Sequence, residues 1–416
     1  MLKTEVSINY SRISKTHLLS YTAIAVLLLT LIGYPLVAPV SIILQIDNRL
    51  VSVPFRALVL LLSLMVIIKG FVLRDRFPAG PFWIVWWIFW GLYISRIIID
   101  GLLNPEVLRL PLSEYLLYAI GMSLIPALAL SIKLDDYILN RALIWLIVLG
   151  ALASVLSIWM IIGNKELMAI SDLTVGRQAT DTLNPIGLAH LGVSVVIMCS
   201  WVLCRAETHG PLQYALFIIS LLIGAGAVLA GASRGPMFVL MITLPMIIYT
   251  GIKNLHGKHL FRLSVIIVGF LLALVWLLIN IETITALHRV QESLFTDDTR
   301  MGLFDAGLEL FLNNPILGAG TEPLECYPHN VILESFMLSG VFSGFLFLTI
   351  LMMSLVAAIK IFFVYPKNSW ISLLYFQYLL GAMFSGSLYL SASMWALMVL
   401  VVSQLAVCRV EKSVLN

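Results

Sequence analysis

The sequence YPHNVILESFMLSGVFSGFLFLTILMM, residues 327–353, passes within four positions from a polar segment into a long apolar one. Its polar end closes a loop of about 50 residues, 281–329, which is the one long polar loop of the chain. Its apolar part exceeds the roughly 20 residues that a helix needs to cross a bilayer. His329 is therefore expected at a boundary between water and lipid, where an imidazole can accept a proton from a bound molecule.

The composition of the whole chain is that of a membrane protein. Of its 416 residues 61% are hydrophobic and 11% are charged, and the mean hydropathy is +1.02. Soluble domains carry about 25% charged residues, so most of this chain is expected in lipid. The net charge of +3, without a basic run interleaved with aromatic residues, argues against nucleic acid as a partner. The four cysteines include no Cys-x-x-Cys pair, which argues against disulfides and metal clusters.

The apolar segments predict an all-α polytopic membrane protein with about twelve transmembrane helices. Residues 1–416 are expected to form a single integral membrane domain, in which 281–329 is a large external (periplasmic) loop. Sixteen of the 25 basic residues fall on one side of these segments, which places both termini in the cytoplasm. The predicted spans are 17–37, 53–73, 80–100, 112–132, 139–162, 184–204, 211–231, 235–252, 260–280, 336–359, 370–387 and 389–408.

The long loop is predicted to contain an amphipathic helix. Met301, Phe304, Leu308 and Phe311 recur at spacings of three, four and three, which places them on one helical face. The sequence Asn313-Asn314-Pro315 is a stop signal for this helix. The helix either lies flat on the outer membrane interface or packs against the rest of the protein, and in both cases it holds the loop over the membrane.

Arg234 lies in a very short connection, Gly231-Ala232-Ser233-Arg234-Gly235-Pro236, between two predicted spans. A charge at the edge of the membrane is a functional candidate by default, although an arginine there can also reach lipid phosphates. The planar guanidinium binds phosphate through two hydrogen bonds and stays charged. We therefore predict that Arg234 binds a phosphate of a substrate head group, with Gly235 allowing close approach to the backbone.

Three other arginines on the predicted outer side are candidates for substrate binding. Arg300 opens the loop helix, where the helix N-terminus also favours anions, although an ion pair with a neighbouring aspartate is an alternative. Arg177 lies in an external loop that leads into a span. Arg56 begins the second span and is either a substrate contact or an interfacial anchor.

His329 follows a proline that fits the first turn of a helix. The helix dipole at that position favours the neutral imidazole, which suits a general base, although an ordinary interfacial histidine fits the same position. Glu325 and Glu334 are the carboxylates close enough in sequence to orient the ring. His190, within an apolar span, is interpreted as a hydrogen-bond partner between helices.

The order of these motifs resembles the O-antigen ligase/polymerase superfamily, over about residues 176–345. In that family a His-Asn pair ends the large periplasmic loop and a glycine follows after nine residues, as His329-Asn330 and Gly340 do here. Ser233-Arg234-Gly235 between two spans and the stretch 314–320, Asn-Pro-Ile-Leu-Gly-Ala-Gly, look like the same pattern. The family's second small residue falls here on Ser343, but Gly340 and Gly344 predict a close contact between helices.

The resemblance implies a metal-independent, inverting glycosyltransferase of the bacterial inner membrane that needs no cofactor. Its donor would be an undecaprenyl-diphosphate-linked oligosaccharide, with membrane lipid as its surroundings and a flippase or chain-length regulator as further partners. It implies that His329 removes a proton from the acceptor hydroxyl while Arg234 and Arg300 hold the diphosphate. The predicted substrate-binding residues are Arg177, Ser233, Gly235, Asn330 and Arg56.

Several functions remain open at this point. An O-antigen polymerase joins lipid-linked repeat units, whereas an O-antigen ligase transfers the finished chain to lipid A–core. The modest length of loop 281–329 favours the polymerase. A flippase for lipid-linked oligosaccharide would also need many spans and arginines, but it would not need a histidine fixed at the membrane boundary. A non-catalytic partner in polysaccharide assembly is the remaining alternative.

Overall fold

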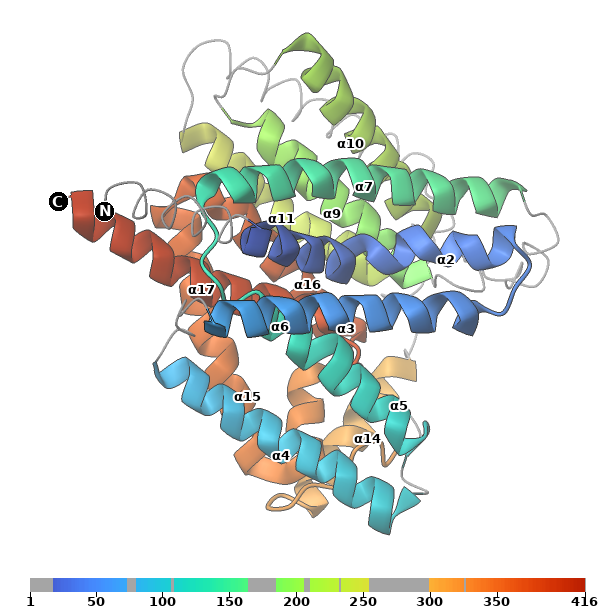
Figure 1. Ribbon diagram of the computed structural model, residues 1–416. Coiled ribbons are helices and arrows are strands. Elements are labelled where there is room, and N and C mark those ends of the chain that lie inside the picture. The colour runs from blue at the N-terminus through green and yellow to red at the C-terminus, as the bar shows by residue number, and fades with distance from the viewer. Residues whose placement is uncertain are drawn as a thin grey trace, which may run out of the picture.

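The computed structural model describes residues 18–72, 80–105, 108–163, 185–205, 210–231, 233–253, 299–324 and 327–415 (Figure 1). Within these ranges all regular secondary structure is helical, which confirms the all-α fold. Eight helices are long and apolar enough to cross a membrane, namely Leu18–Ile43, Asn48–Val72, Pro81–Leu103, Leu112–Ala129, Asp136–Met160, Ile186–Leu203, Pro211–Gly231 and Val331–Val364.

The elements keep the labels of Figure 1. They are η1 (Leu29–Gly33), α2 (Tyr34–Ile43), α3 (Asn48–Val72), α4 (Pro81–Leu103), α5 (Leu112–Leu116), η3 (Leu117–Leu124), α6 (Ile125–Ala129), α7 (Asp136–Gly163), α9 (Pro185–Leu203), α10 (Pro211–Gly231), α11 (Arg234–Lys253), α14 (Thr299–Asn313), α15 (Val331–Val364), η4 (Pro366–Asn368), α16 (Ser369–Ser385) and α17 (Ala392–Leu415).

Three further predicted spans are present as the helices α11, α16 and α17. Their apolar stretches are shorter than those of the eight helices named above. The apolar parts of α11 and α17 cover Gly235–Gly251 and Ala392–Cys408, and α16 has 17 residues. The remaining predicted span, 260–280, lies outside the described residues. The membrane class is therefore established, while the number of twelve spans stays a prediction.

The helices pack as one bundle around an aromatic core. In Figure 1, α2, α3 and α7 run side by side, with α9, α10 and α11 on one side and α4, α5, α14 and α15 on the other. Trp86 and Trp90 of α4 pack against Trp395 of α17, with ring centroids 5.3 and 4.9 Å apart. Phe89, also on α4, packs on Phe347 of α15 at 5.6 Å. Offset and edge-on aromatic pairs of this kind fix the crossing of α4, α15 and α17.

Helix α15 is broken near its start, at Ser339 and Gly340, whose backbone angles are not helical. A break leaves backbone groups without helical partners, and these need other partners in an apolar environment. The loop after α14 supplies them, because Val341 N–H donates to Pro315 O at 2.8 Å and Ala319 N–H donates to Met337 O at 2.7 Å. The segment 314–320 is thus docked into the break by its main chain.

Gly340 makes this docking possible, which corrects the expected glycine contact between helices. Its φ of 72° and ψ of −161° lie in a region that glycine alone adopts readily. A Cβ on it would also come within 2.6 Å of Pro315 O. Gly344 faces the ring of Phe336 on the same helix, rather than a neighbouring helix. Gly340 therefore accommodates the break in α15 and the docked loop, and Gly344 accommodates the ring of Phe336. The two glycines do not form the predicted small-xxx-small contact between helices.

A buried carboxylate ties the same loop to α4. Asp100, 2% exposed, accepts hydrogen bonds from Thr321 N at 2.8 Å and from Thr321 Oγ1 at 2.7 Å. Arg96 donates through Nε to Asp100 at 3.0 Å and through a terminal nitrogen to Leu317 O at 2.9 Å. Charge-assisted hydrogen bonds are stronger than neutral ones, so this cluster fixes the loop on the end of α4.

A second buried carboxylate joins three segments that are distant in sequence. Glu322, 2% exposed, accepts hydrogen bonds from the hydroxyls of Tyr115 at the start of the fourth span and of Tyr389 in the turn before α17. The Tyr389 bond measures 3.0 Å. The loop that leads to His329 is therefore anchored at Thr321 and Glu322 before it reaches the histidine.

Replacing Asp100 with alanine is expected to destabilise the protein. The change leaves the buried Thr321 N–H and hydroxyl without their acceptor, at a cost of about 1–3 kcal/mol for each buried group left unsatisfied. Thermal unfolding of the detergent-solubilised variant should show a lower midpoint. Asp47→Ala is the matched control, because Asp47 is exposed and accepts only a local hydrogen bond from Arg49 N. Equal midpoints for the two variants would contradict the assigned role of Asp100.

Candidate active site

Asn330 sets the start of α15 and, with it, the position of His329. Its Oδ1 accepts hydrogen bonds from Ile332 N and Leu333 N, each at 3.0 Å, which is the geometry of an N-cap. The helix begins at Val331, directly after the polar loop, as predicted. Pro328 precedes the cap and is not in the first turn, which corrects the expectation for that residue.

The backbone of His329 is held in a conformation that residues with side chains rarely adopt. Its φ is +56°, in the left-handed region. Such strain persists only where the surroundings enforce it, and it is concentrated at functional sites. The imidazole meets the ring of Tyr327 edge to face, with centroids 4.6 Å apart. The backbone conformation of His329 and its contact with Tyr327 together fix the direction of the imidazole.

The predicted loop helix is present as α14 and ends at Asn313, as its stop signal indicated. It packs on the start of α15, because a Cβ on Gly307 would lie 3.2 Å from Leu333 Cδ2. Phe311 also packs edge to face on Phe336 at 5.2 Å. These contacts favour packing against the protein over a purely interfacial position. Phe304 and Leu308 remain 37% and 39% exposed on this helix.

Glu334 does not orient His329. It is 1% exposed, and its Oε2 accepts a hydrogen bond from Leu388 N at 2.9 Å. The carboxylate therefore ties α15 to the turn 386–391 between α16 and α17. The other carboxylate considered for this role, Glu325, lies outside the described residues.

The predicted short connection before Arg234 is confirmed, because α10 ends at Gly231 and α11 begins at Arg234. Ser233 is 2% exposed. A Cβ on Gly235 would lie 3.8 Å from Phe384 Cβ, so this connection borders the end of α16. The backbone thus places Arg234 at a helix N-terminus, where anions are favoured. Its side chain lies outside the described part of the structure.

The structure places the other predicted arginines to different extents. The backbone of Arg300 is in the first turn of α14, but its side chain is outside the described part, as is the whole of Arg177. The guanidinium of Arg56 lies over the ring of Tyr118, 4.7 Å from its centroid. Tyr118 in turn neighbours Tyr389 at 6.1 Å. The substrate-binding roles of these residues stay predictions.

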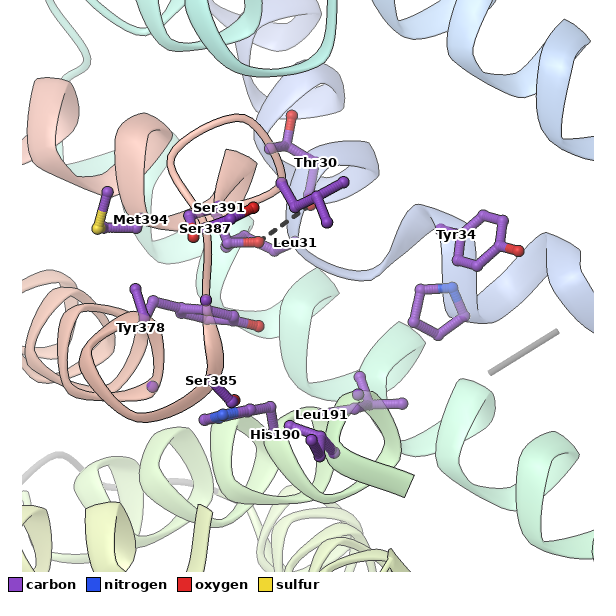
Figure 2. A pocket seen from close by; sticks show the side chains of 18 of the residues that line it. Thr30, Leu31, Tyr34, His190, Leu191, Tyr378, Ser385, Ser387, Ser391 and Met394 are labelled. Carbon is purple, nitrogen blue, oxygen red and sulfur yellow. Dashed lines mark hydrogen bonds between the residues drawn. The ribbon is translucent and has the colours of Figure 1, made fainter. Parts of the chain in front are cut away.

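A cavity of about 370 Å³ lies between the two motifs (Figure 2). Tyr327, which contacts His329, is part of its wall, and so are Ser385 and Gly386 at the end of α16, next to the Phe384 that borders Gly235. The turn 386–391 supplies Gly386, Ser387, Leu390 and Ser391 to the same wall. Sequence reasoning missed this cavity because its wall combines residues near 30, 190, 327 and 380–394.

His190 belongs to this cavity, and Nδ1 of its ring has no hydrogen-bond partner among the described residues. A Cβ on Gly381 of α16 would come within 2.5 Å of His190 Cε1, so the ring lies directly against that glycine. The contact between helices is made by the backbone instead, where His190 O accepts a hydrogen bond from Gln377 Nε2 at 2.8 Å. The histidine side chain is thereby left to line the cavity.

These features define an integral membrane protein with a polar, loop-covered site at one end of a helical bundle. Residues 219–348, somewhat less than a third of the chain, match the family model Wzy_C, described as O-antigen ligase. The match agrees with the resemblance of these motifs to the O-antigen ligase/polymerase superfamily. It includes Ser233-Arg234-Gly235, His329-Asn330 and Gly340. None of the curated proteins compared with the chain matches it.

Proposed function

We propose that this protein is a glycosyltransferase of the bacterial inner membrane that polymerises O-antigen or related repeat units on the periplasmic side. Its donor is an undecaprenyl-diphosphate-linked glycan, and both of its termini are cytoplasmic. The observation that carries the proposal is the conformation of His329, a histidine with φ of +56° fixed between an anchored loop and the capped start of α15. A transporter has no need of a histidine held in a strained conformation at this position.

The proposed reaction is a single displacement at the anomeric carbon of the donor. The acceptor hydroxyl attacks this carbon, and His329 takes the hydroxyl proton as the new C–O bond forms. The bond between the anomeric carbon and the diphosphate oxygen breaks, and the lipid diphosphate leaves with the bonding electrons. One direct displacement inverts the configuration. The diphosphate is a good leaving group, so the proposed step uses no metal ion.

The arginines are assigned to the diphosphate. Arg234 at the start of α11 and Arg300 at the start of α14 both lie at helix N-termini, where the helix dipole adds to their positive charge. They stabilise the negative charge that grows on the leaving group. Arg177 is a further candidate for the same role. Asn330 uses its oxygen for the cap, so we assign its substrate contact to the amide nitrogen.

Further substrate contacts are assigned to the two neighbours of Arg234 in sequence and to Arg56. Ser233 and Gly235 flank Arg234, and the guanidinium of Arg56 already lies over Tyr118. The position of Gly235 beside Phe384 leaves its backbone close to the end of α16. These residues would position the head group while Arg234 holds its charge.

Replacing Arg234 with lysine is expected to lower the transfer rate by about 10²-fold, although the positive charge is retained. Lysine is a point charge and cannot form the paired hydrogen bonds that guanidinium makes with phosphate. The loss of one preorganised donor to a developing oxyanion typically costs about 10²–10³-fold in rate. Arg141→Lys, at an exposed arginine that contacts Tyr137, is the control and should keep wild-type transfer. A wild-type rate in Arg234→Lys would remove Arg234 from the mechanism.

Ligase activity is the second candidate, since the matching family model is described as O-antigen ligase. Both activities use the same donor and differ only in the acceptor. Supplying the purified protein with lipid-linked repeat units, with and without lipid A–core, separates them. A polymerase lengthens the lipid-linked chain without lipid A–core, whereas a ligase makes product only when lipid A–core is present.

The transport alternative is tested in cells by the face on which lipid-linked repeat units accumulate. In a strain whose only copy is His329→Ala, the proposed enzyme defect predicts accumulation on the periplasmic face. Accumulation on the cytoplasmic face would indicate a flippase instead. Unchanged glycan synthesis would indicate a non-catalytic assembly partner.

A further inference from the structure

The cavity beside Tyr327 contains buried polar atoms that have no hydrogen-bond partner among the described residues. They are Oγ1 of Thr30, Nδ1 of His190 and Oγ of Ser387, and all three residues line the cavity. In Figure 2, Thr30 and His190 lie on opposite sides of the cavity, with Tyr378 and Tyr34 flanking it. A buried polar group without a partner costs free energy, so three around one cavity indicate a ligand that offers hydrogen bonds.

The local structure of Thr30 supports the same conclusion. Thr30 lies in η1, a π-helical turn within the first span, and such turns occur frequently at functional sites. Its backbone oxygen already accepts a hydrogen bond from Ser393 Oγ at 3.3 Å, so the wide turn is fixed to α17. Its hydroxyl is left for the cavity. The backbone of Thr30 is thus held in place, while its hydroxyl has no partner among the described residues.

The chemistry of the wall selects an uncharged, hydroxyl-bearing ligand. The described residues that line the cavity include no Asp, Glu, Lys or Arg, so a diphosphate has no counter-charge there. Tyr34, Tyr327 and Tyr378 add aromatic surface, against which the C–H face of a sugar ring packs well. A volume of about 370 Å³ falls within the range of about 300–1,000 Å³ that is usual for small-molecule sites.

We propose that this cavity binds a neutral sugar ring of the glycan, with Thr30, His190 and Ser387 as its hydrogen-bonding residues. The inference rests on the proposed function for the identity of the glycan. It places the sugar next to Tyr327, whose ring contacts His329, in a cavity whose described wall contains no arginine. Sugar selection is thereby separated from the charged part of the site, which acts on any lipid-diphosphate donor.

The test is direct binding of a glycan that carries no lipid and no phosphate. The oligosaccharide repeat unit of the native strain is released from its lipid by mild acid and titrated onto the full-length protein in detergent, followed by saturation-transfer NMR. The double variant Thr30→Val/Ser387→Ala removes two hydroxyls with little change in shape. Affinity should fall by about fivefold to tenfold for each lost hydrogen bond. The folded state should be no less stable, because both hydroxyls lack partners among the described residues.

Ser403→Ala is the matched control, because Ser403 in α17 also has a buried hydroxyl without a partner among the described residues but is outside the cavity wall. The proposal expects wild-type affinity in this variant. Equal affinity of the double variant and wild type overturns it, and so does the absence of glycan binding to wild type. Displacement of the glycan by undecaprenyl phosphate alone would assign the cavity to lipid and also overturn it. Normal transfer by His329→Asn would defeat the proposed function while leaving the binding result interpretable.

Discussion

Replacing His329 with asparagine is expected to lower the transfer rate by about 10²–10⁴-fold, the range that a general base contributes. Asparagine tolerates the left-handed backbone better than most residues, so the φ of +56° can persist in the variant. The side chain cannot act as a base at neutral pH. The measurement is the rate of glycan transfer by protein purified to equal amounts, alongside the thermal unfolding midpoint.

Chemical rescue distinguishes a base from a structural residue at this position. His329→Gly relieves the backbone strain and leaves room beside the ring of Tyr327. Added imidazole should restore part of the transfer rate in His329→Gly and should have no effect on the wild type. A variant that folds normally and transfers glycan at the wild-type rate would show that His329 is not the base.

Replacing Gly340 with alanine is expected to destabilise the protein by about 3 kcal/mol or more. The backbone at φ 72° and ψ −161° is strained for any residue with a Cβ, which costs about 1–3 kcal/mol. The new Cβ would also meet the backbone oxygens of Pro315 and Ile316, which belong to the docked loop and cannot move aside as a side chain could. Expression level and thermal midpoint in detergent are the measurements.

Gly91→Ala is the control for this change. Gly91 is helical and exposed in α4, and apart from its chain neighbours and the nearby backbone of its own helix no atom lies within 4 Å of its added Cβ. Alanine should therefore stabilise that helix by about 0.5–1 kcal/mol. Equal midpoints for Gly340→Ala and wild type would show that the break in α15 does not hold the loop.

Much of the framework could be predicted from local sequence patterns. Long apolar runs identify spanning helices, and the spacing of apolar residues identified α14 with its end at Asn313. The start of α15 directly after His329-Asn330 and the short connection before Arg234 follow from the same reasoning. Each of these features depends on residues within one turn or one helix of each other, which is why the sequence alone reveals them.

The supports of the site could not be predicted, because they join distant segments. Thr321 bonds to Asp100 across 221 positions, and Glu334 bonds to Leu388 across 54. Proximity in sequence makes Glu334 one of two candidates to orient the imidazole, but its carboxylate binds the turn before α17. The role of Gly340 was also misread, since a helix break and a helix contact require the same small residue. These two roles of Gly340 are distinguished only by the segment 314–320, which docks into the break of α15.

Synthesis from purified components tests the central claim most directly. Full-length protein in liposomes is supplied with undecaprenyl-diphosphate-linked repeat units of the native strain alone, and the glycan is separated by size on a gel. The proposed polymerase produces a ladder of chain lengths with wild-type protein and none with His329→Asn. A ladder of equal intensity from His329→Asn, or no product from wild type with either repeat units or lipid A–core as acceptor, would contradict the account.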